Sequence, residues 1–326
     1  MIRIEMKPLK IGNLEIKNPI IAAPLAGVSD KAYRKILKEN EVPLVFTEMV
    51  SAKALIYENQ KSRKIVDIIG ETKPIGMQIF GSNINEINEA AKYLESIGAD
   101  LIDFNIGCPA PKIVKNSEGS ALLKEPIKAL KILENLVNSV SVPVTLKIRK
   151  GFSEGHYDAM PIIKELENIG VKAIFLHGRY REQYYSGKAD WDYIKLVNES
   201  VNIPVIGNGD VNDPYSAEKI LKETGCDGIL VGRGFLGNPF LFKEIMEYFN
   251  NGKIILASNE EKLKTALRQL DYAVDDKGEN LAIREMRKHL GWYLKGMKNG
   301  ASLRNKINTC DNLEVLKNLI DEILMR

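Results

Sequence analysis

The stretch Leu101-Ile-Asp-Phe-Asn-Ile-Gly-Cys-Pro-Ala-Pro-Lys112 joins a short apolar run to a turn that carries a cysteine. Residues 101–104 have the composition of a strand buried on both faces, which reads as a continuous apolar run. Residues 105–109 follow where such a strand should end. We therefore expect Cys108 on a loop at the carboxyl end of a strand, a place where loops carry function. A small buried hydrophobe is the alternative role for this cysteine.

Seven similar runs alternate with helical patterns over roughly the first 230 residues. Eight parallel strands, each followed by a helix, form a (β/α)8 barrel, whereas a doubly wound sheet usually has fewer strands. The sequence therefore predicts an α/β protein with a TIM-barrel domain at residues 1–250. The expected strands are 20–24, 44–47, 75–79, 101–104, 143–148, 173–176, 204–207 and 228–231. The expected helices are 30–38, 52–57, 62–68, 85–97, 126–138, 158–168, 191–198 and 214–223.

The pattern changes after Asn250-Asn-Gly252, because residues 259–326 carry only helical periodicities. This segment is too short for another barrel, so we expect residues 251–326 to form a smaller all-helical domain. Residues 282–306 hold seven Lys or Arg against Glu285 as the single acid. Clustered positive charge with nearby aromatic residues suits an RNA backbone. A solvated face with the aromatic residues packed inward is the alternative.

Composition narrows the class of protein further. The chain has three cysteines, at positions 108, 226 and 310, without C-x-x-C spacing. It has no apolar run long enough for a membrane span and no signal-peptide pattern at its start. These features fit a reduced cytoplasmic compartment, with no disulfide framework, no membrane and no metal site. Because the net charge is only +3, affinity for nucleic acid must come from a local patch.

Polar or reactive residues stand at the end of every predicted strand except the first, which ends in the turn Pro24-Leu-Ala-Gly27. A barrel places its functional groups at the carboxyl ends of its strands. Any one of these residues could be an ordinary surface residue, but their coincidence predicts a ligand site at one rim. They are Glu48, Gln78, Asn105 with Cys108, Lys147 with Arg149, His177 with Arg179, Asn208-Gly-Asp210, and Gly232-Arg233.

The last two loops predict a phosphate site. Glycine lets backbone N–H groups approach an anion, and barrels often bind phosphate after strands seven and eight. Arg233 adds a charged fork. Gly232-Arg-Gly-Phe-Leu-Gly237 also matches the dinucleotide fingerprint, but only helices follow it, which excludes a Rossmann site.

A phosphate here, with Gln78 and Lys147 pointing inward, suits flavin mononucleotide (FMN). A lysine near the pyrimidine edge of the flavin would stabilise the reduced ring. The alternative for Lys147 is a charge pair with a barrel carboxylate. His177 would hydrogen-bond the flavin or the substrate, or else be an inert packed histidine.

At these residues the chain resembles the tRNA-dihydrouridine synthases over nearly its full length. The most specific match is the signature Asn105-Ile-Gly-Cys-Pro109. The chain departs from the family pattern at Leu25, Tyr180 and Phe240, where methionine, threonine and tryptophan are usual. The other matches are Pro24-Leu-Ala-Gly27, Glu48-Met49, Gln78-Ile-Phe-Gly81, Gly119-Ser-Ala-Leu-Leu123, Lys147-Ile-Arg149, His177-Gly-Arg179, Asn208-Gly-Asp210, Gly232-Arg233, Arg284, His289, Trp292 and Tyr293.

The resemblance implies an oxidoreductase that reduces the C5=C6 bond of specific uridines in tRNA, with FMN recharged by NADPH. Hydride would reach C6 from the flavin, and Cys108 would protonate C5. A thiol with an ordinary pKa of about 8.5 is protonated at neutral pH, as a general acid must be. The expected FMN-binding residues are Pro24, Leu25, Ala26, Gln78, Lys147, His177, Asn208, Gly209, Asp210, Gly232 and Arg233. The expected substrate-binding residues are Asn105, Arg149, Arg179, Arg284, Arg287 and Lys288.

A target base inside folded RNA must be extruded to reach the floor of a barrel, and the basic helical domain would then hold the RNA backbone beside the mouth. The nearest rival is an FMN barrel acting on a free pyrimidine, such as a dihydroorotate dehydrogenase, which would not need a basic helical domain. A non-catalytic RNA-binding barrel is a more distant rival. An aldolase or isomerase barrel without FMN is least favoured, since no Schiff-base or metal constellation is evident.

Overall fold

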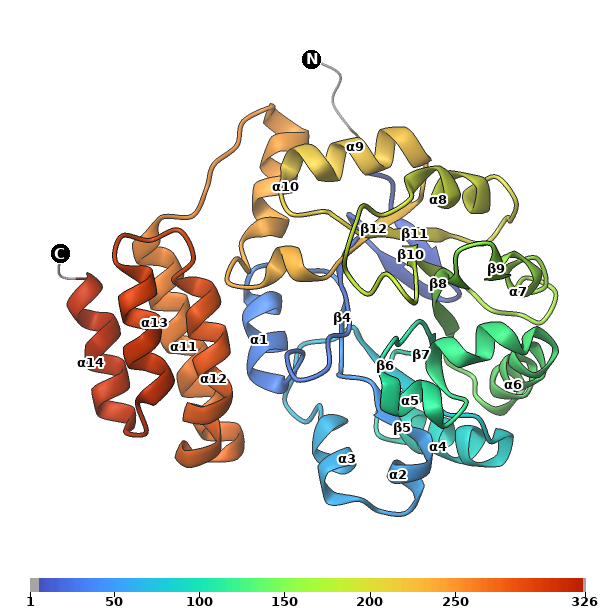
Figure 1. Cartoon of the computed structure of the whole chain (residues 1–326), viewed down its shortest axis with the longest axis horizontal. Coiled ribbons are helices and arrows are strands. Elements are labelled where there is room, and N and C mark those ends of the chain that lie inside the picture. Colours follow the sequence, from blue (N-terminus) through green and yellow to red (C-terminus); the bar gives the residue numbers. More distant parts are fainter. Residues whose placement is uncertain (1–5, 325–326) are drawn as a thin grey trace.

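The computed structural model describes residues 6–324 and contains the predicted barrel (Figure 1). The parallel strands follow one another in the order β3-β12-β11-β10-β8-β7-β6-β4. The Ala22 N–H donates to the Leu44 carbonyl at 3.1 Å, which joins the first strand to the segment that enters the second and closes the ring. The strands are β3 (Ile20–Ala22), β4 (Val45–Phe46), β6 (Ile75–Phe80), β7 (Leu101–Ile106), β8 (Val144–Ser153), β10 (Ile174–Tyr180), β11 (Val205–Asn208) and β12 (Gly228–Val231).

All eight predicted strands are confirmed, but three are longer than the apolar runs suggested. β7, β8 and β10 continue into polar sequence, so Asn105, Arg149 and His177 lie within strands, not in the loops after them. The pairing register explains why, because Asn105 stands opposite Lys147 and His177 opposite Arg149. Polar side chains that point into the barrel leave the backbone ladder intact.

Helices cover the outside of the barrel, and most begin and end close to the predicted residues (Figure 1). The Asp30 side chain caps α1 by accepting from the Tyr33 N–H; the sequence allowed either Ser29 or Asp30 in this role. The helices are α1 (Lys31–Glu39), α2 (Ala52–Ile56), α3 (Gln60–Ile65), α4 (Ile84–Ser96), α5 (Pro111–Lys115), α6 (Pro126–Ser139), α7 (Met160–Ile163), α8 (Trp191–Asn198), α9 (Pro214–Thr224) and α10 (Leu241–Asn251). Two 3₁₀ helices, Gly119–Lys124 and Arg233–Phe235, follow strands β7 and β12.

The helix predicted over residues 158–168 is wrong in extent. Its start is taken by strand β9 (His156–Asp158), which pairs with β8 in a hairpin. Only α7 is α-helical; beyond it, the N–H groups of Glu165 and Leu166 donate to carbonyls three residues back, in tighter turns. A second short strand, β5 (Val50–Ser51), extends the pairing with β6 and was also not predicted.

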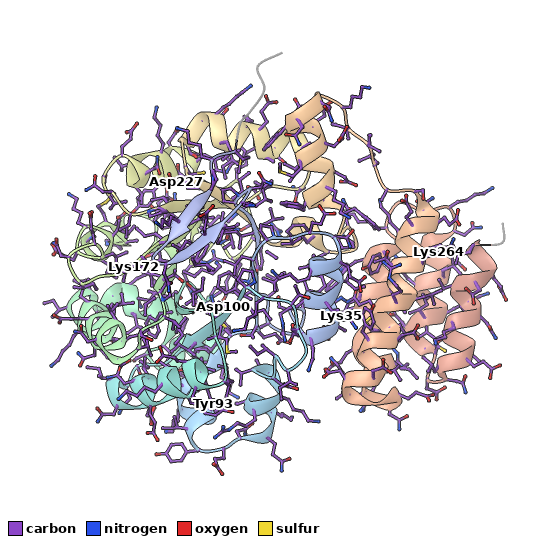
Figure 2. The ribbon with its side chains drawn as sticks, turned by 180° about the vertical axis from the view of Figure 1, so that it is seen from behind. Lys35, Tyr93, Asp100, Lys172, Asp227 and Lys264 are labelled. Atoms are coloured by element: carbon purple, nitrogen blue, oxygen red, sulfur yellow. The ribbon has the colours of Figure 1, made fainter. Side chains whose placement is uncertain are left out.

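The interior of the barrel is apolar at its amino-terminal end and polar at its carboxyl end. A hairpin of β1 (Leu9–Ile11) and β2 (Leu14–Ile16) adds its buried side chains to the apolar part. Phe46 and Phe175 meet edge to face there, with ring centroids 5.4 Å apart. Figure 2 shows the amino-terminal end, with the pale blue hairpin near Lys172 and Asp227, the residues that lead into strands β10 and β12.

The C-terminal helices α11 (Asn259–Lys277), α12 (Glu279–Tyr293), α13 (Gly300–Thr309) and α14 (Leu313–Leu324) pack around a core of their own. Gly278 separates α11 from α12 and Asn299 precedes α13, each with a positive φ angle. Among residues 6–324, no helix combines the length and the apolarity that a membrane span requires.

The helical part docks on α1 of the barrel, beside which α11 and α12 lie (Figure 1). Lys277 of α11 donates to Asp30 at 2.6 Å and to Glu285 at 2.7 Å. Gly237, after the last barrel strand, packs directly on α12, since a Cβ at this position would lie 2.4 Å from the Trp292 carbonyl oxygen. These contacts fix the helices beside the carboxyl end of the barrel.

Candidate active site

One pocket opens at the carboxyl ends of the barrel strands, and every barrel strand or the loop after it contributes to its wall. Most of the predicted rim residues therefore meet in space, but Glu48 and Arg179 lie outside the wall, and the Glu48 carboxylate accepts the Gly27 N–H instead. Those in the wall are Pro24, Leu25, Ala26, Gln78, Asn105, Cys108, Lys147, Arg149, His177, Asn208, Gly209, Asp210, Gly232 and Arg233. Pocket residues to which the sequence drew no attention are Ala23, Tyr185, Val211, Asn212 and Leu230, and Met49 was matched to the family pattern without a role.

The Cys108 turn, residues 105–109, is held from two sides. Asn105 Oδ1 accepts the backbone N–H groups of Gly107 at 2.9 Å and Cys108 at 2.8 Å. On the other side, Ser120 Oγ donates to the Cys108 carbonyl at 2.8 Å. Gly119 allows this approach, because it has a positive φ angle and a Cβ there would lie 3.1 Å from that of Cys108. The segment 119–123 thus packs against Cys108 and holds its carbonyl group in place.

The Cys108 side chain is 9% exposed and opens into the pocket. Burial raises the pKa of its thiol, while the Ala110 N–H and the cations Lys147 and Arg149 oppose that rise. The group is therefore a protonated thiol at neutral pH. It can donate a proton to a ligand in the pocket.

A buried acid lies beneath this turn, in the middle of β7. Asp103 accepts hydrogen bonds from Gln78 Nε2 at 2.6 Å and from Thr145 Oγ1 at 2.8 Å. Burial raises its pKa and lowers the pKa of Lys147, and the attraction between the two opposes both shifts. Lys147 thus lines the pocket and is attracted electrostatically to a barrel carboxylate, while its contact with a flavin stays a prediction. Asp103 could not be recognised from the sequence, because an acid inside an apolar run gives no sign of its partners.

Arg149 ties the Cys108 turn to the loop after β10. Its guanidinium donates to the carbonyls of Gly107 at 3.0 Å, Tyr180 at 2.8 Å and Tyr184 at 3.0 Å. Burial lowers its pKa to about 10, which leaves it a cation at neutral pH. Arg149 therefore holds two walls of the pocket together and gives them a positive charge.

His177 is an uncharged imidazole at neutral pH. Its pKa lies well below the usual value because the ring is buried, and because Arg149, Lys147, Arg179 and Arg233 surround it. It lines the pocket, where a neutral ring can accept or donate a hydrogen bond.

Arg179 does not line the pocket, in contrast to the expected substrate contact. Its Nη2 donates to both carboxylate oxygens of Asp210 at 2.8 Å and to the Gly187 carbonyl at 2.7 Å, and its Nε donates to the Ser186 carbonyl. It is fully buried behind the pocket wall. A direct contact with a ligand would break these bonds, so Arg179 acts as a clamp on the loop 180–187. This loop carries the pocket residue Tyr185. The two adjacent tyrosines, Tyr184 and Tyr185, were the feature of the sequence that could have indicated it.

The wall is predominantly positive, with Lys147, Arg149 and Arg233 against Asp210. Arg233 is 47% exposed and lies 3.5 Å from Asp210. Gly232 next to it faces open space, since a Cβ there would meet no atom nearer than 3.9 Å. A side chain at this position would fill the pocket, and its absence leaves a backbone cradle for an anionic ligand. Within residues 6–324, no three His, Cys, Asp or Glu side chains are grouped as metal ligands.

The basic residues of α12 differ in their surroundings. Arg284 and Lys288 are exposed. Arg287 instead donates to the Cys310 carbonyl, at 2.6 Å from Nη2, and so joins α12 to the end of α13. Lys288 reaches the barrel rim, because its Nζ lies 3.6 Å from the position of a Cβ on Gly27. Tyr293 is buried and Trp292 is half-buried, in line with the inward-packing interpretation of these aromatic residues, and His289 is buried as well.

Known proteins are similar to this chain along nearly its whole length. A family model described as dihydrouridine synthase (Dus) matches residues 20–326. A probable tRNA-dihydrouridine synthase of Rickettsia conorii is 41% identical over 316 residues, 96% of each chain. The tRNA-dihydrouridine synthase B of Vibrio parahaemolyticus is 37% identical over 320 residues, which cover 97% of this chain and 99% of that one.

Solved structures share the fold at low identity. Histamine dehydrogenase from Rhizobium sp. 4-9 superposes with a TM-score of 0.57 at 16% identity, covering 87% of this chain and 50% of that one. A 2-naphthoyl-CoA reductase gives a TM-score of 0.60 at 15% identity, with coverages of 74% and 52%. At such identities the likeness shows the barrel fold alone.

Proposed function

The chain belongs to the dihydrouridine synthase family, and on this premise we propose that it reduces uridines of tRNA to 5,6-dihydrouridine. The observation that carries the proposal is the position of Cys108, a protonated thiol that opens into a pocket lined by cations and amides. Reduction of a uracil C5=C6 bond needs a proton donor at C5 once hydride has reached C6. Cys108 meets that need.

The pocket suits FMN. Its anionic phosphate fits the cradle at Gly232 and Arg233, where a side chain would fill the space. When bound and reduced by NADPH, FMN would supply the hydride for C6. The residues that would hold it are Pro24, Leu25, Ala26, Gln78, Lys147, His177, Asn208, Gly209, Asp210, Gly232 and Arg233.

The side chains of this protein bind the uracil and move its proton. Asn105 and Arg149 hold the base, and Lys147 stabilises the negative charge that spreads over C5, C4 and O4. The Cys108 S–H bond breaks as the C5–H bond forms, and solvent later returns a proton to the thiolate. Burial of Cys108 keeps the thiol protonated until that step.

The helical part, residues 251–326, would hold the tRNA backbone while the target base is extruded into the pocket. Arg284 and Lys288 are exposed on α12, and Lys288 reaches the barrel rim beside Gly27. Arg287 would act indirectly, by joining α12 to the end of α13. Arg179 would act indirectly as well, by clamping the pocket loop to Asp210.

The proposed function is tested by incubating the purified protein with FMN, NADPH and tRNA that lacks dihydrouridine. Digested tRNA should contain a uridine heavier by two hydrogens, as detected by mass spectrometry. A flavin-loaded protein that reduces or oxidises a free pyrimidine while leaving tRNA unchanged would support the dihydroorotate dehydrogenase-like alternative.

The pH dependence of the reduction rate should reveal the ionisation of the general acid. A general acid works only in its protonated form, so the single-turnover rate should be flat through neutral pH and fall as the Cys108 thiol ionises. Because burial raises this pKa, the fall should begin above the range of a free thiol. An earlier fall is expected from Lys147, whose pKa burial lowers to about 8, because its charge stabilises the reduced uracil. Cys108→Ser should remove the later fall and leave the earlier one. A later fall that persists in Cys108→Ser would contradict the assignment of the acid.

The phosphate cradle predicts a role for Arg233 in flavin affinity. Arg233→Ala should weaken FMN binding by about tenfold, since a charge-assisted hydrogen bond at a half-exposed site is lost. Arg181→Ala, at a rim arginine outside the pocket wall, is the matched control and should leave affinity unchanged. Equal affinity in both variants, measured by fluorescence titration of FMN, would place the phosphate elsewhere.

A further inference from the structure

Asp103 has no role in the steps assigned above, although it is fully enclosed in the barrel interior. Burying a charge costs free energy unless it is paired and hydrogen-bonded. Asp103 has both kinds of partner, since Gln78 and Thr145 donate to it and Lys147 supplies the opposite charge. An apolar side chain would fill the same place at lower cost, so the acid invites a functional explanation.

The hydrogen bonds that connect Asp103 to the Cys108 turn all run in one direction. Gln78 donates its Nε2 hydrogen to the carboxylate at 2.6 Å, which turns its Oε1 towards Asn105. Asn105 Nδ2 donates to this oxygen at 2.8 Å, which leaves Asn105 Oδ1 facing the turn. That oxygen accepts the N–H groups of Gly107 and Cys108. We call this chain of contacts the Asp103 relay.

Direction matters because an amide side chain can be rotated so that its donor and its acceptor exchange places. An ionised carboxylate only accepts, so it permits one orientation of Gln78 and, through Gln78, one of Asn105. In the reversed orientation the Asn105 NH₂ group would face the Cys108 N–H. Two buried donors would then oppose each other, and the turn would lose its acceptor. The carboxylate excludes this arrangement.

The Asp103 relay also determines which hydrogen-bonding groups the pocket wall offers to a ligand. Gln78 and Asn105 both line the pocket. With the amides oriented by Asp103, Gln78 uses one N–H of its NH₂ group within the relay and keeps a second, whereas the second N–H of Asn105 points to Met49 Sδ at 3.8 Å. A thioether sulfur is a weak acceptor, so a ligand carbonyl can replace it. The wall can therefore offer N–H donors, which suit the carbonyl oxygens of a pyrimidine.

We infer that Asp103 is a positioning residue for uridine reduction, because its carboxylate orients the amides of Gln78 and Asn105 and thereby holds Cys108 in place. The effect on turnover rests on the proposed function. The relay itself rests on the contacts alone.

Asp103→Asn tests the inference, because the carboxamide keeps the shape but can donate as well as accept, so both amide orientations become accessible. We expect kcat for dihydrouridine formation to fall by at least about tenfold, as a misplaced reacting group does. The KM for tRNA should stay within about twofold, because phosphate contacts dominate the affinity for RNA and the relay does not make them. Alkylation of Cys108 by iodoacetamide, followed by peptide mass spectrometry, should become several times faster because the turn loosens.

Thr145→Val is the matched control. It removes the other hydrogen bond to the same carboxylate and leaves the relay untouched. Its kcat and its Cys108 alkylation rate should stay close to those of the unchanged protein. The inference is overturned if Asp103→Asn leaves both quantities unchanged, or if Thr145→Val changes them equally, because the effect would then come from any disturbance of the barrel interior.

A measurement on the unchanged protein covers the case in which Asp103→Asn does not fold. Neutron diffraction from crystals exchanged into D₂O should place deuterium on Gln78 Nε2 facing Asp103, and on Asn105 Nδ2 facing Gln78. Deuterium on the Asp103 carboxyl, directed at Gln78 Oε1, would overturn the inference. If the unchanged protein forms no dihydrouridine, the proposed function fails by itself, and alkylation and neutron diffraction still test the relay.

Discussion

Cys108→Ala should reduce the rate of dihydrouridine formation by roughly 10²- to 10⁴-fold, the usual contribution of a positioned general acid. The substitution removes the S–H group and little else, because the turn is held through the Cys108 backbone, by Asn105 and Ser120. Reduction of bound flavin by NADPH does not use the thiol and should proceed at the unchanged rate. Dihydrouridine is measured by mass spectrometry of digested tRNA, and flavin reduction by absorbance.

Cys226→Ala is the matched control for this prediction. Cys226 is equally buried, but its sulfur donates to the Gly228 carbonyl at 3.2 Å and lies outside the pocket wall. The control should retain nearly full activity. A Cys108→Ala variant as active as Cys226→Ala would remove the thiol from the reaction.

Reversing three charges of the helical part should weaken tRNA binding by roughly a hundredfold at physiological salt, because phosphate contacts dominate affinity. Arg284 and Lys288 lie one turn apart on α12, and Lys295 follows just beyond its end; all three are exposed. Substituting each by Glu should also make the salt dependence shallower, by a slope of about one per lost phosphate contact. Arg287 is left intact, because its bond to Cys310 is structural. The flavin spectrum should not change.

A control with the same change in net charge separates local contacts from the general field. Lys262, Lys264 and Lys317 lie on α11 and α14 of the same helical part. Reversing these three should reduce tRNA affinity only slightly, as filter binding over a range of salt concentrations would show. Equal losses in the two triple variants would mean that net charge alone attracts the RNA, and no loss in either would place the footprint elsewhere.

The barrel could be predicted because each strand is an apolar run that ends at glycine, proline or a polar residue. The topology then gathers the strand ends at one rim, so Gln78, Lys147 and Asn208 could be assigned to one pocket without any knowledge of contacts. The family signature around Cys108 supplied the chemistry. Prediction of the fold and of the pocket lining therefore worked where a local pattern and a general rule of the fold were sufficient, and the role of Cys108 stays a prediction.

Partners that lie elsewhere in the chain could not be predicted from a local pattern. Arg179 and Arg287 stood among predicted ligand contacts, yet backbone carbonyls and Asp210 occupy their guanidinium groups. Asp103 was hidden in an apolar run, although three strands converge on it. The hairpin of β1 and β2 is too short to give a periodic signal, and it forms because the amino-terminal end of the barrel offers an apolar surface.

The most direct test of the central claim asks which protein atom faces C5 of the uracil. A tRNA with 5-bromouridine at the target position carries a leaving group on that carbon, so a thiol placed to deliver a proton there should instead form a carbon–sulfur bond and release bromide. Proteolysis and mass spectrometry should find the nucleotide attached to Cys108. An adduct on another residue, or none with a flavin-loaded protein that binds this tRNA, would contradict the account.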